Sequence, residues 1–142
     1  MRFMILLKAD QDTEAGKMPD EQLLRDMTSF NQELVDAGVM LGGDGLHPTA
    51  KGAKVRFADG KVEVTDGPFP LTGEQLAGFW LWQCASKEEA IEWVKRVPMP
   101  MASGKAEIEI RQLFDAADFG DAMTPELREQ EEAMRAAVAA RQ

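Results

Sequence analysis

A rigid turn at residues 66–74 separates two strand-like runs and constrains the fold more than any other stretch of the chain. Its sequence is DGPFPLTGE, in which Gly67 can take a positive φ and the two prolines lock φ. The flanking strand-like runs cover residues 54–65 and 78–84. Because such a cluster fixes the backbone by sterics, we expect Asp66 to be held at the rim of this turn.

The composition is that of a globular protein without a basic surface. The chain has 142 residues, 44% of them hydrophobic, and a formal net charge of -9, so it can form a hydrophobic core. Direct nucleic-acid binding and docking on anionic membranes both need clustered positive charge, and we expect neither partner. The apolar run at the N-terminus is too short for a signal peptide or a membrane span, which predicts a cytoplasmic protein.

Cysteine and histidine are too few for a disulfide or a Cys/His metal site. The chain has one Cys and one His. Cys84 lies in a strand-like run beside tryptophans, so we interpret it as a buried, unreactive thiol in preference to a reactive one. No loop has the ligand spacing typical of Mg²⁺ or Ca²⁺ sites. We therefore expect no metal and no cofactor.

Hydrophobic periodicity predicts the order strand, helix, strand, hairpin, strand, helix, strand. Helix-start signals occur at Asp20 and Ser86, and prolines at 98 and 100 end the second helix. The predicted strands are residues 2–8, 40–46, 54–57, 61–64, 78–84 and 106–114. The strand at 2–8 is expected to be central and buried on both faces, and the strands at 54–57 and 61–64 to form a hairpin with one wet face. Residues 9–17 are predicted to form a loop.

Two helices on one side of a mostly antiparallel sheet describe an α+β, ferredoxin-like (split βαβ) sandwich. A third helix from Thr124 has sparse apolar positions, typical of a surface or partner-facing helix. We expect a first domain at residues 1–115 and a helical extension at 116–142. The bare sheet face would expose apolar surface, so we expect a second copy to cover it in a homodimer.

The run DGPF at residues 66–69 resembles the signature of the DGPF subgroup of the YCII-related family. The flanks GLHP (45–48), EQLAGFW (74–80), EEAIEW (88–93) and IEIR (108–111) agree with it, and the resemblance covers about the first four-fifths of the chain, enough for one domain. It implies a ferredoxin-like fold, a dimer of the α/β-barrel type and a pocket around Asp66. Some relatives are encoded near, or fused to, alternative sigma factors. Others act on small organic molecules, including a chlorinated aromatic intermediate.

The chain departs from the family pattern at two places. The subgroup carries Glu-Thr-Lys-Glu after the motif, whereas this chain has LTGE at residues 71–74, so Leu71 replaces a carboxylate. Smaller YCII-related proteins pair an Asp with a His at the start of the first helix. Here that helix begins with DEQ at residues 20–22, and His47 is the candidate partner that remains.

Asp66 and His47 are the candidate catalytic residues. Asp66 either caps the Gly-Pro turn by accepting backbone N–H bonds, or lies beside apolar side chains that raise its pKa for acid/base work. His47 is the side chain whose ordinary pKa is near neutrality. If residues 45–48 approach the turn, the two side chains form an orienter–base pair.

The candidate substrate-binding residues are Arg111, Arg2, Gly45, Phe69 and Trp82. Arg111 and Arg2 lie on strands that would be neighbours, where either binds an anion bidentately, and the alternative for Arg111 is an ion pair with Glu107 or Glu109. The glycines of residues 42–45 serve either close packing or ligand access.

Two functions fit these residues. One is a small-molecule-binding protein, an enzyme or former enzyme with acid/base chemistry at Asp66 and His47. The alternative is a non-catalytic dimeric module that binds a ligand or a regulatory partner linked to transcription. The sequence leaves open whether the chain is an enzyme.

Overall fold

The computed structural model describes residues 1–98 and 105–142. It divides into two compact units, Met1–Gln112 and Leu113–Gln142. The first unit contains the rigid turn and all the residues proposed from the sequence as a site.

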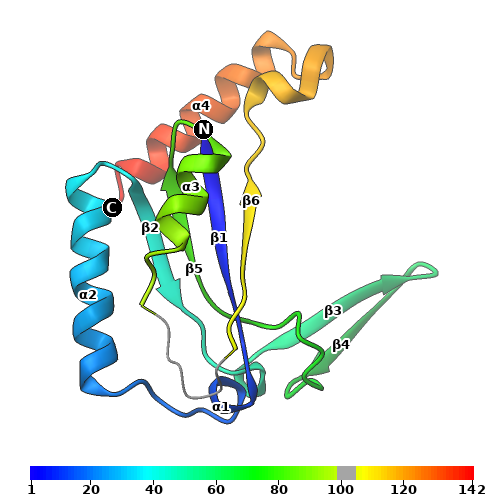
Figure 1. Cartoon of the computed structure of the whole chain (residues 1–142). Coiled ribbons are helices and arrows are strands. Elements are labelled where there is room, and N and C mark those ends of the chain that lie inside the picture. Colours follow the sequence, from blue (N-terminus) through cyan, green and yellow to red (C-terminus); the bar gives the residue numbers. More distant parts are fainter. Residues whose placement is uncertain (99–104) are drawn as a thin grey trace. The chain divides into compact units, whose positions relative to one another are not determined.

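A four-stranded antiparallel sheet with two helices forms the body of the first unit (Figure 1). Its spatial order is β2-β5-β1-β6. The elements are β1 (Arg2–Lys8), α2 (Glu21–Asp36), β2 (Met40–Gly45), β5 (Leu76–Gln83), α3 (Lys87–Val94) and β6 (Ile108–Gln112). Because β5 lies between β1 and β2, and β1 between β5 and β6, the connections are split βαβ units. The predicted ferredoxin-like α+β fold is confirmed.

The helix ends follow the capping signals in the sequence. Asp20 is the N-cap of α2 and accepts a hydrogen bond from the Leu23 N–H at 2.8 Å. Gly38 follows that helix with a φ of 72°, the left-handed conformation that suits glycine. Ser86 caps α3, and Pro98 follows it after a short turn, whereas residue 100 lies outside the described residues.

The hydrophobic core lies between the sheet and the two helices. Its largest fully buried side chains are Trp82, Phe3, Ile5 and Leu34. Phe30 of α2 packs edge-on against Trp80, with ring centroids 5.9 Å apart. Cys84 is also buried, which confirms its predicted position in the core, and burial raises the pKa of its thiol.

Within the described residues of the first unit, α2 and α3 pack on one side of the sheet only, and the prediction that β1 is buried on both faces is wrong. Phe3 and Ile5 are buried, whereas Met4 and Leu6 are half-buried. Side chains alternate along each strand, so one uncovered surface, here called the open face, carries Met4, Leu6, Lys8, Phe79, Leu81, Glu109 and Arg111.

A separate two-stranded hairpin, here called the arm, extends from the body (Figure 1). It consists of β3 (Ala53–Ala58) and β4 (Lys61–Asp66). Asp59 and Gly60 have φ values of 51° and 72°, which gives the predicted Asp-Gly turn. The expectation of one wet face is incomplete, because the apolar face is exposed as well.

A few short segments differ from the elements predicted from the sequence. The predicted loop at residues 9–17 contains a four-residue helix, α1 (Gln11–Glu14), capped by Asp10. Two 3₁₀ segments, η1 (Thr49–Lys51) and η2 (Ala116–Ala122), were not predicted, because their sequences have no apolar periodicity. The last strand is shorter than the predicted 106–114.

The glycines of β2 serve close packing at one position. The β2–β5 register shifts between Met40 and Gly42, which confirms an irregular edge strand. A Cβ on Gly43 would lie 2.6 Å from the Trp80 ring and 2.9 Å from the Phe79 carbonyl oxygen. By contrast, a Cβ on Gly42 or Gly45 meets open space.

The second unit consists of η2 and the helix α4 (Pro125–Ala139). Thr124 caps α4 and Pro125 opens it, which confirms the predicted helix. Leu127, Met134 and Val138 are all exposed. In the described part of the chain, no helix is long and apolar enough to cross a membrane.

Candidate functional site

The turn at residues 66–69 is packed directly on the segment that follows β2. The Gly67 N–H donates to the Gly52 carbonyl oxygen at 2.9 Å. A Cβ on Gly67 would lie 1.7 Å from the Thr49 carbonyl oxygen. Gly67 is not among the glycines with positive φ, so the expectation of a positive φ is wrong. Glycine is required here because two backbone segments approach closely.

Thr49 connects the turn to α1. Its hydroxyl accepts a hydrogen bond from the Phe69 N–H at 3.0 Å and donates to Oε2 of Glu14 at 2.7 Å. The Thr49 N–H donates to the other Glu14 oxygen at 3.1 Å. This relay is half-buried, and hydrogen bonds to an ionised carboxylate are the stronger kind. The ammonium of Lys54 lies 4.3 Å from the centre of the Phe69 ring.

The chain after the turn is attached to the end of β1. The Ala9 N–H donates to the Gln75 carbonyl oxygen at 2.8 Å. The Gln75 side chain accepts from the Thr72 N–H at 2.9 Å and donates to the Pro70 carbonyl oxygen. These contacts close residues 70–75 into a compact loop. The loop is thus fixed at both ends, by Thr49 on one side and by β1 on the other.

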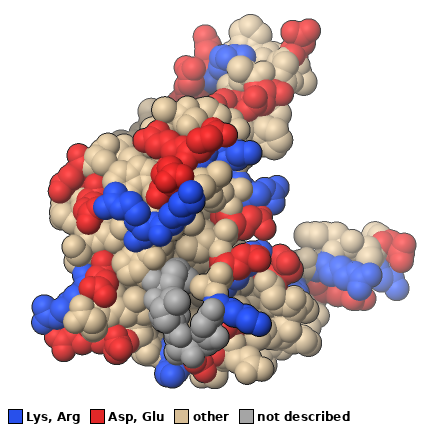
Figure 2. Space-filling model, in the orientation of Figure 1, with Lys and Arg blue, Asp and Glu red and all other residues tan. Residues whose placement is uncertain are grey.

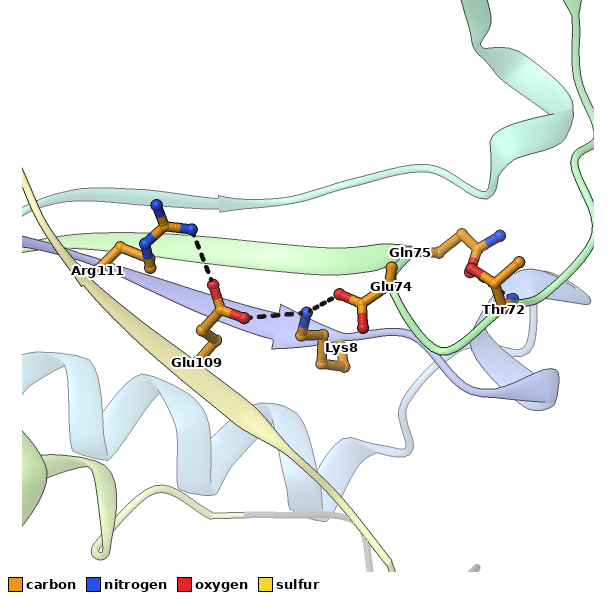
Figure 3. Close-up of polar contacts among 6 residues, drawn as sticks. All are labelled: Lys8, Thr72, Glu74, Gln75, Glu109 and Arg111. Carbon is orange, nitrogen blue, oxygen red and sulfur yellow. Dashed lines mark hydrogen bonds and ion pairs between the residues drawn. The ribbon is translucent and has the colours of Figure 1, made fainter.

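Four charged side chains form a row along the open face (Figure 3). The Lys8 ammonium lies 2.8 Å from Glu74 and 3.4 Å from Glu109, and Glu109 lies 3.3 Å from Arg111. The Lys8 side chain is only 9% exposed, although it carries a charge. We call Lys8, Glu74, Glu109 and Arg111 the charge row. It joins the loop after the turn to β1 and β6.

The charge row shifts two pKa values. The hydrogen bond from Lys8 to Glu74 is the main cause that raises the pKa of the lysine, against a smaller opposing effect of burial. The Arg111 guanidinium, followed by Lys8, lowers the pKa of Glu109 below its ordinary value of 4.5. Both shifts favour the charged forms. Near neutral pH Lys8 is therefore a cation and Glu109 a carboxylate.

Asp66 and His47 are both exposed near the turn. Asp66 is the last residue of β4, and His47 follows β2. The segment after β2 does approach the turn, through Thr49. Within residues 1–98 and 105–142, no hydrogen bond or ion pair joins the two side chains. The carboxylate of Asp66 also accepts no hydrogen bond there, since the turn amides are bound by Gly52 and Thr49.

Arg111 and Arg2 share the open face. β1 and β6 are neighbours, and Arg111 pairs with Met4, two residues from Arg2. The ion pair of Arg111 with Glu109 is the alternative weighed from the sequence. Gly45 ends β2 opposite Gly78. Trp82, in contrast, is fully buried on the helix-covered face.

Sequence reasoning missed Lys8, Glu74, Thr49 and Glu14. Lys8 has a usable signal, because it continues the period-two alternation of Met4 and Leu6 at the end of a strand. Glu74 lies in the loop between the turn and β5. Thr49 and Glu14 have no local signal, since they are 35 residues apart and meet only after folding.

A shallow, open depression lies elsewhere, on the exposed side of α2. It is lined by Glu21, Leu24, Arg25, Thr28, Ser29 and Gln32. Because α2 covers the core side of the sheet, this depression and the open face are on opposite sides of the first unit. None of the charge-row residues contributes to it.

Comparisons with known proteins agree on the family of the first unit. The YCII-related domain model matches residues 1–114. An uncharacterized protein of Rhizobium meliloti (strain 1021) is 35% identical over 97 residues, which cover 67% of this chain and 78% of that protein. The residues that the family model matches contain the turn, the sheet and the charge row.

Proposed function

Because the chain belongs to the YCII-related family, we propose that it binds a small organic molecule with an anionic group on the open face, beside the turn at residues 66–69. The matched relative is an uncharacterized protein, so the proposal rests on the site itself. The turn is fixed by hydrogen bonds on both sides. A fixed turn next to an uncovered sheet face is a suitable place for a ligand.

The proposed binding of an anionic group depends on Arg111. Its side chain is 72% exposed, and its ion pair with Glu109 spans 3.3 Å. A guanidinium has five N–H donors in a planar fork, so donors remain for a carboxylate or similar anion. Lys8 adds positive charge but is nearly covered by its two acidic partners. Arg111 is therefore the residue to which the anionic group binds.

The apolar part of the ligand would lie on Met4, Leu6, Phe79 and Leu81. These side chains are half-buried on the open face, so each still has surface to cover. Phe69 at the turn adds an aromatic surface. The chemical class supported best is an aromatic or aliphatic carboxylate with an apolar body.

The proposal also includes acid/base catalysis by Asp66 and His47. Asp66 and His47 are exposed near the same turn, and a bound ligand that reached both would give the carboxylate and the imidazole separate roles. A second candidate function requires no catalytic pair. In that case the protein is a non-catalytic ligand- or partner-binding module, with a link to transcriptional regulation.

A second copy of the chain is the expected partner. The described part of the first unit places no second layer on the open face, and apolar sheet faces of this kind are commonly buried in dimers. We propose a homodimer that covers it.

Isothermal titration with a panel of small carboxylates, benzoate among them, tests the binding site. Arg111→Gln should weaken binding of the carboxylates at least about tenfold, the cost of a lost charge-assisted hydrogen bond. Arg25→Gln is the matched control, because Arg25 is 71% exposed and ion-paired on the other side of the unit. Equal affinities for wild type and Arg111→Gln would contradict the proposal.

The same panel separates binding from catalysis. Compounds that bind are incubated with wild type and with Asp66→Asn, and product is followed by mass spectrometry. Turnover by wild type that Asp66→Asn abolishes would support the acid/base function. Binding without turnover of any compound would support the non-catalytic module.

A further inference from the structure

The tip of the arm contains one of three Asp-Gly pairs in the chain, and the three pairs have different surroundings. The pairs are Asp44-Gly45, Asp59-Gly60 and Asp66-Gly67. Aspartate rearranges most readily before glycine, because glycine has no side chain to shield its nitrogen from the neighbouring carboxyl group. The reaction requires that the glycine nitrogen and the aspartate carboxyl carbon come together, so the local backbone decides which pair reacts.

Two of the three pairs are held by backbone contacts in the body of the first unit. The Gly67 N–H donates to the Gly52 carbonyl oxygen at 2.9 Å, and a Cβ on Gly67 would lie 1.7 Å from the Thr49 carbonyl oxygen. Gly45 lies in β2 opposite Gly78 of β5, where strand pairing keeps the backbone extended. These contacts prevent either glycine nitrogen from turning toward the aspartate before it.

The third pair, at the tip of the arm, is not held in this way. Asp59 and Gly60 are both exposed, and among the described residues no hydrogen bond holds the Gly60 N–H. β3 and β4 pair only with each other, and an isolated two-stranded hairpin is marginally stable in water. Charged side chains of both signs lie on the arm at the right of Figure 2, so water surrounds it. The tip can therefore open locally while the body stays folded.

We propose that Asp59-Gly60 is a site of spontaneous modification, at which the aspartate converts to isoaspartate in the folded protein. The Gly60 nitrogen attacks the side-chain carboxyl carbon of Asp59. An N–C bond forms, and the carboxyl hydroxyl leaves as water with the amide proton, which closes a five-membered succinimide ring. Water then adds to the backbone carbonyl carbon of Asp59, and the bond from that carbon to the nitrogen breaks. One water is lost and one is gained, so the reaction needs no oxidant, cofactor or ligand.

Isoaspartate at residue 59 would lengthen the turn by one backbone carbon, because the chain then runs through the former side-chain carboxyl. A two-residue turn fixes the register of the strands that it joins. Ala58 pairs with Lys61 directly across this turn, and the longer backbone cannot keep that pairing. The modification therefore opens the arm from its tip and leaves the four-stranded sheet unchanged. It is independent of the proposed ligand site and homodimer.

Peptide mapping of incubated protein measures the conversion at each Asp-Gly pair separately. Trypsin cuts after Lys and Arg, so the pairs fall in three different peptides, residues 26–51, 57–61 and 62–87. In folded wild type, isoaspartate should form in peptide 57–61 at least about tenfold faster than in the other two, because only the tip opens locally. In guanidinium chloride, which removes the fold, the three peptides should convert at similar rates. Conversion in peptide 57–61 that is no faster than in the others, or that occurs only after unfolding, would overturn the proposal.

Asp59→Glu is the matched control, because glutamate keeps the charge but would have to close a six-membered ring, which forms far more slowly. Isoaspartate in the whole protein, measured by enzymatic methylation with an isoaspartate methyltransferase, should accumulate in wild type and not in Asp59→Glu. Amide hydrogen exchange of residues 53–66 should be faster in aged than in fresh wild type, and ageing should not change it in Asp59→Glu. Equal accumulation in the two proteins would overturn the proposed site. Isoaspartate at residue 59 without faster exchange would overturn the opening of the arm.

Discussion

At the scale of single residues, the position of the turn depends on Thr49, whose hydroxyl connects the Phe69 amide to Glu14. Thr49→Val keeps the shape of the side chain and removes both hydroxyl bonds, so the half-buried Phe69 amide loses its partner and Glu14 keeps only the bond from the backbone N–H of residue 49. We predict a loss of about 1–3 kcal/mol in the free energy of unfolding. Urea denaturation measures it.

Thr28→Val is the control for this prediction. The Thr28 hydroxyl donates to the Leu24 carbonyl oxygen within an exposed helix face, a local bond of small net value. It should change stability by less than about 0.5 kcal/mol. Equal effects of the two substitutions would mean that the Thr49 relay does not fix the turn.

The ionisation of Glu109 makes the free energy of unfolding depend on pH in the acid range. Its pKa is lowered in the folded protein, mainly by Arg111. The unfolded chain therefore binds the proton more readily, and the contribution is complete above the ordinary pKa of 4.5 and is lost as pH falls through the lowered folded value. In urea denaturation from pH 6 to 3, Glu109→Gln should lose stability less steeply than wild type. If the free energy of unfolding falls equally steeply with pH in both proteins, the charge row does not stabilise the fold through Glu109.

The sequence supported residue predictions where a local rule applied. Asp20, Ser86 and Gly38 cap helix ends, and the neighbouring sequence was sufficient to predict these roles. Gly67 was predicted as a required glycine for the wrong reason, because its close neighbour Thr49 is distant in sequence. The contacts of Lys8 with Glu74 and Glu109 likewise depend on register, which no local pattern states.

At the scale of elements, the turn is a junction where three segments meet. The loop after β2, the end of β4 and the loop before β5 are joined within residues 49–75. Gly67→Ala would bring a Cβ against the Thr49 backbone, so one segment must move. We predict a loss of more than about 2 kcal/mol.

Gly42→Ala is the matched control in the same unit. A Cβ on Gly42 meets open space, so this substitution should change stability by less than about 1 kcal/mol. Thermal denaturation monitored by circular dichroism compares the two. A Gly67→Ala protein as stable as Gly42→Ala would show that the junction is loose.

The regular elements were predictable because each has its own hydrophobic period. Long helices such as α2, and the strands of the sheet, bury one face, which sets the pattern. α1 was missed since it has four residues and buries none of them. The alternation of the arm was predicted correctly, but alternation indicates only which side chains share a face. It does not say what covers that face.

At the scale of the whole molecule, the family match and the first compact unit nearly coincide, at residues 1–114 and Met1–Gln112. The division into domains 1–115 and 116–142 stays a prediction. The site could be predicted in part: the turn and Arg111 were identified from the sequence. Of the charge row, the Arg111–Glu109 ion pair was weighed from the sequence. The contacts of Lys8 with Glu74 and Glu109 could not be predicted, because they join segments that meet only in the folded sheet.

The central claim is that a ligand binds on the open face beside the turn. The most direct measurement is a titration of isotope-labelled protein with benzoate, followed by two-dimensional amide NMR spectra, which report millimolar binding residue by residue. The account predicts saturable shifts at the amides of Lys8, Phe69 and Arg111, which Arg111→Gln abolishes. Shifts confined to the exposed side of α2, or no saturable shift, would contradict it.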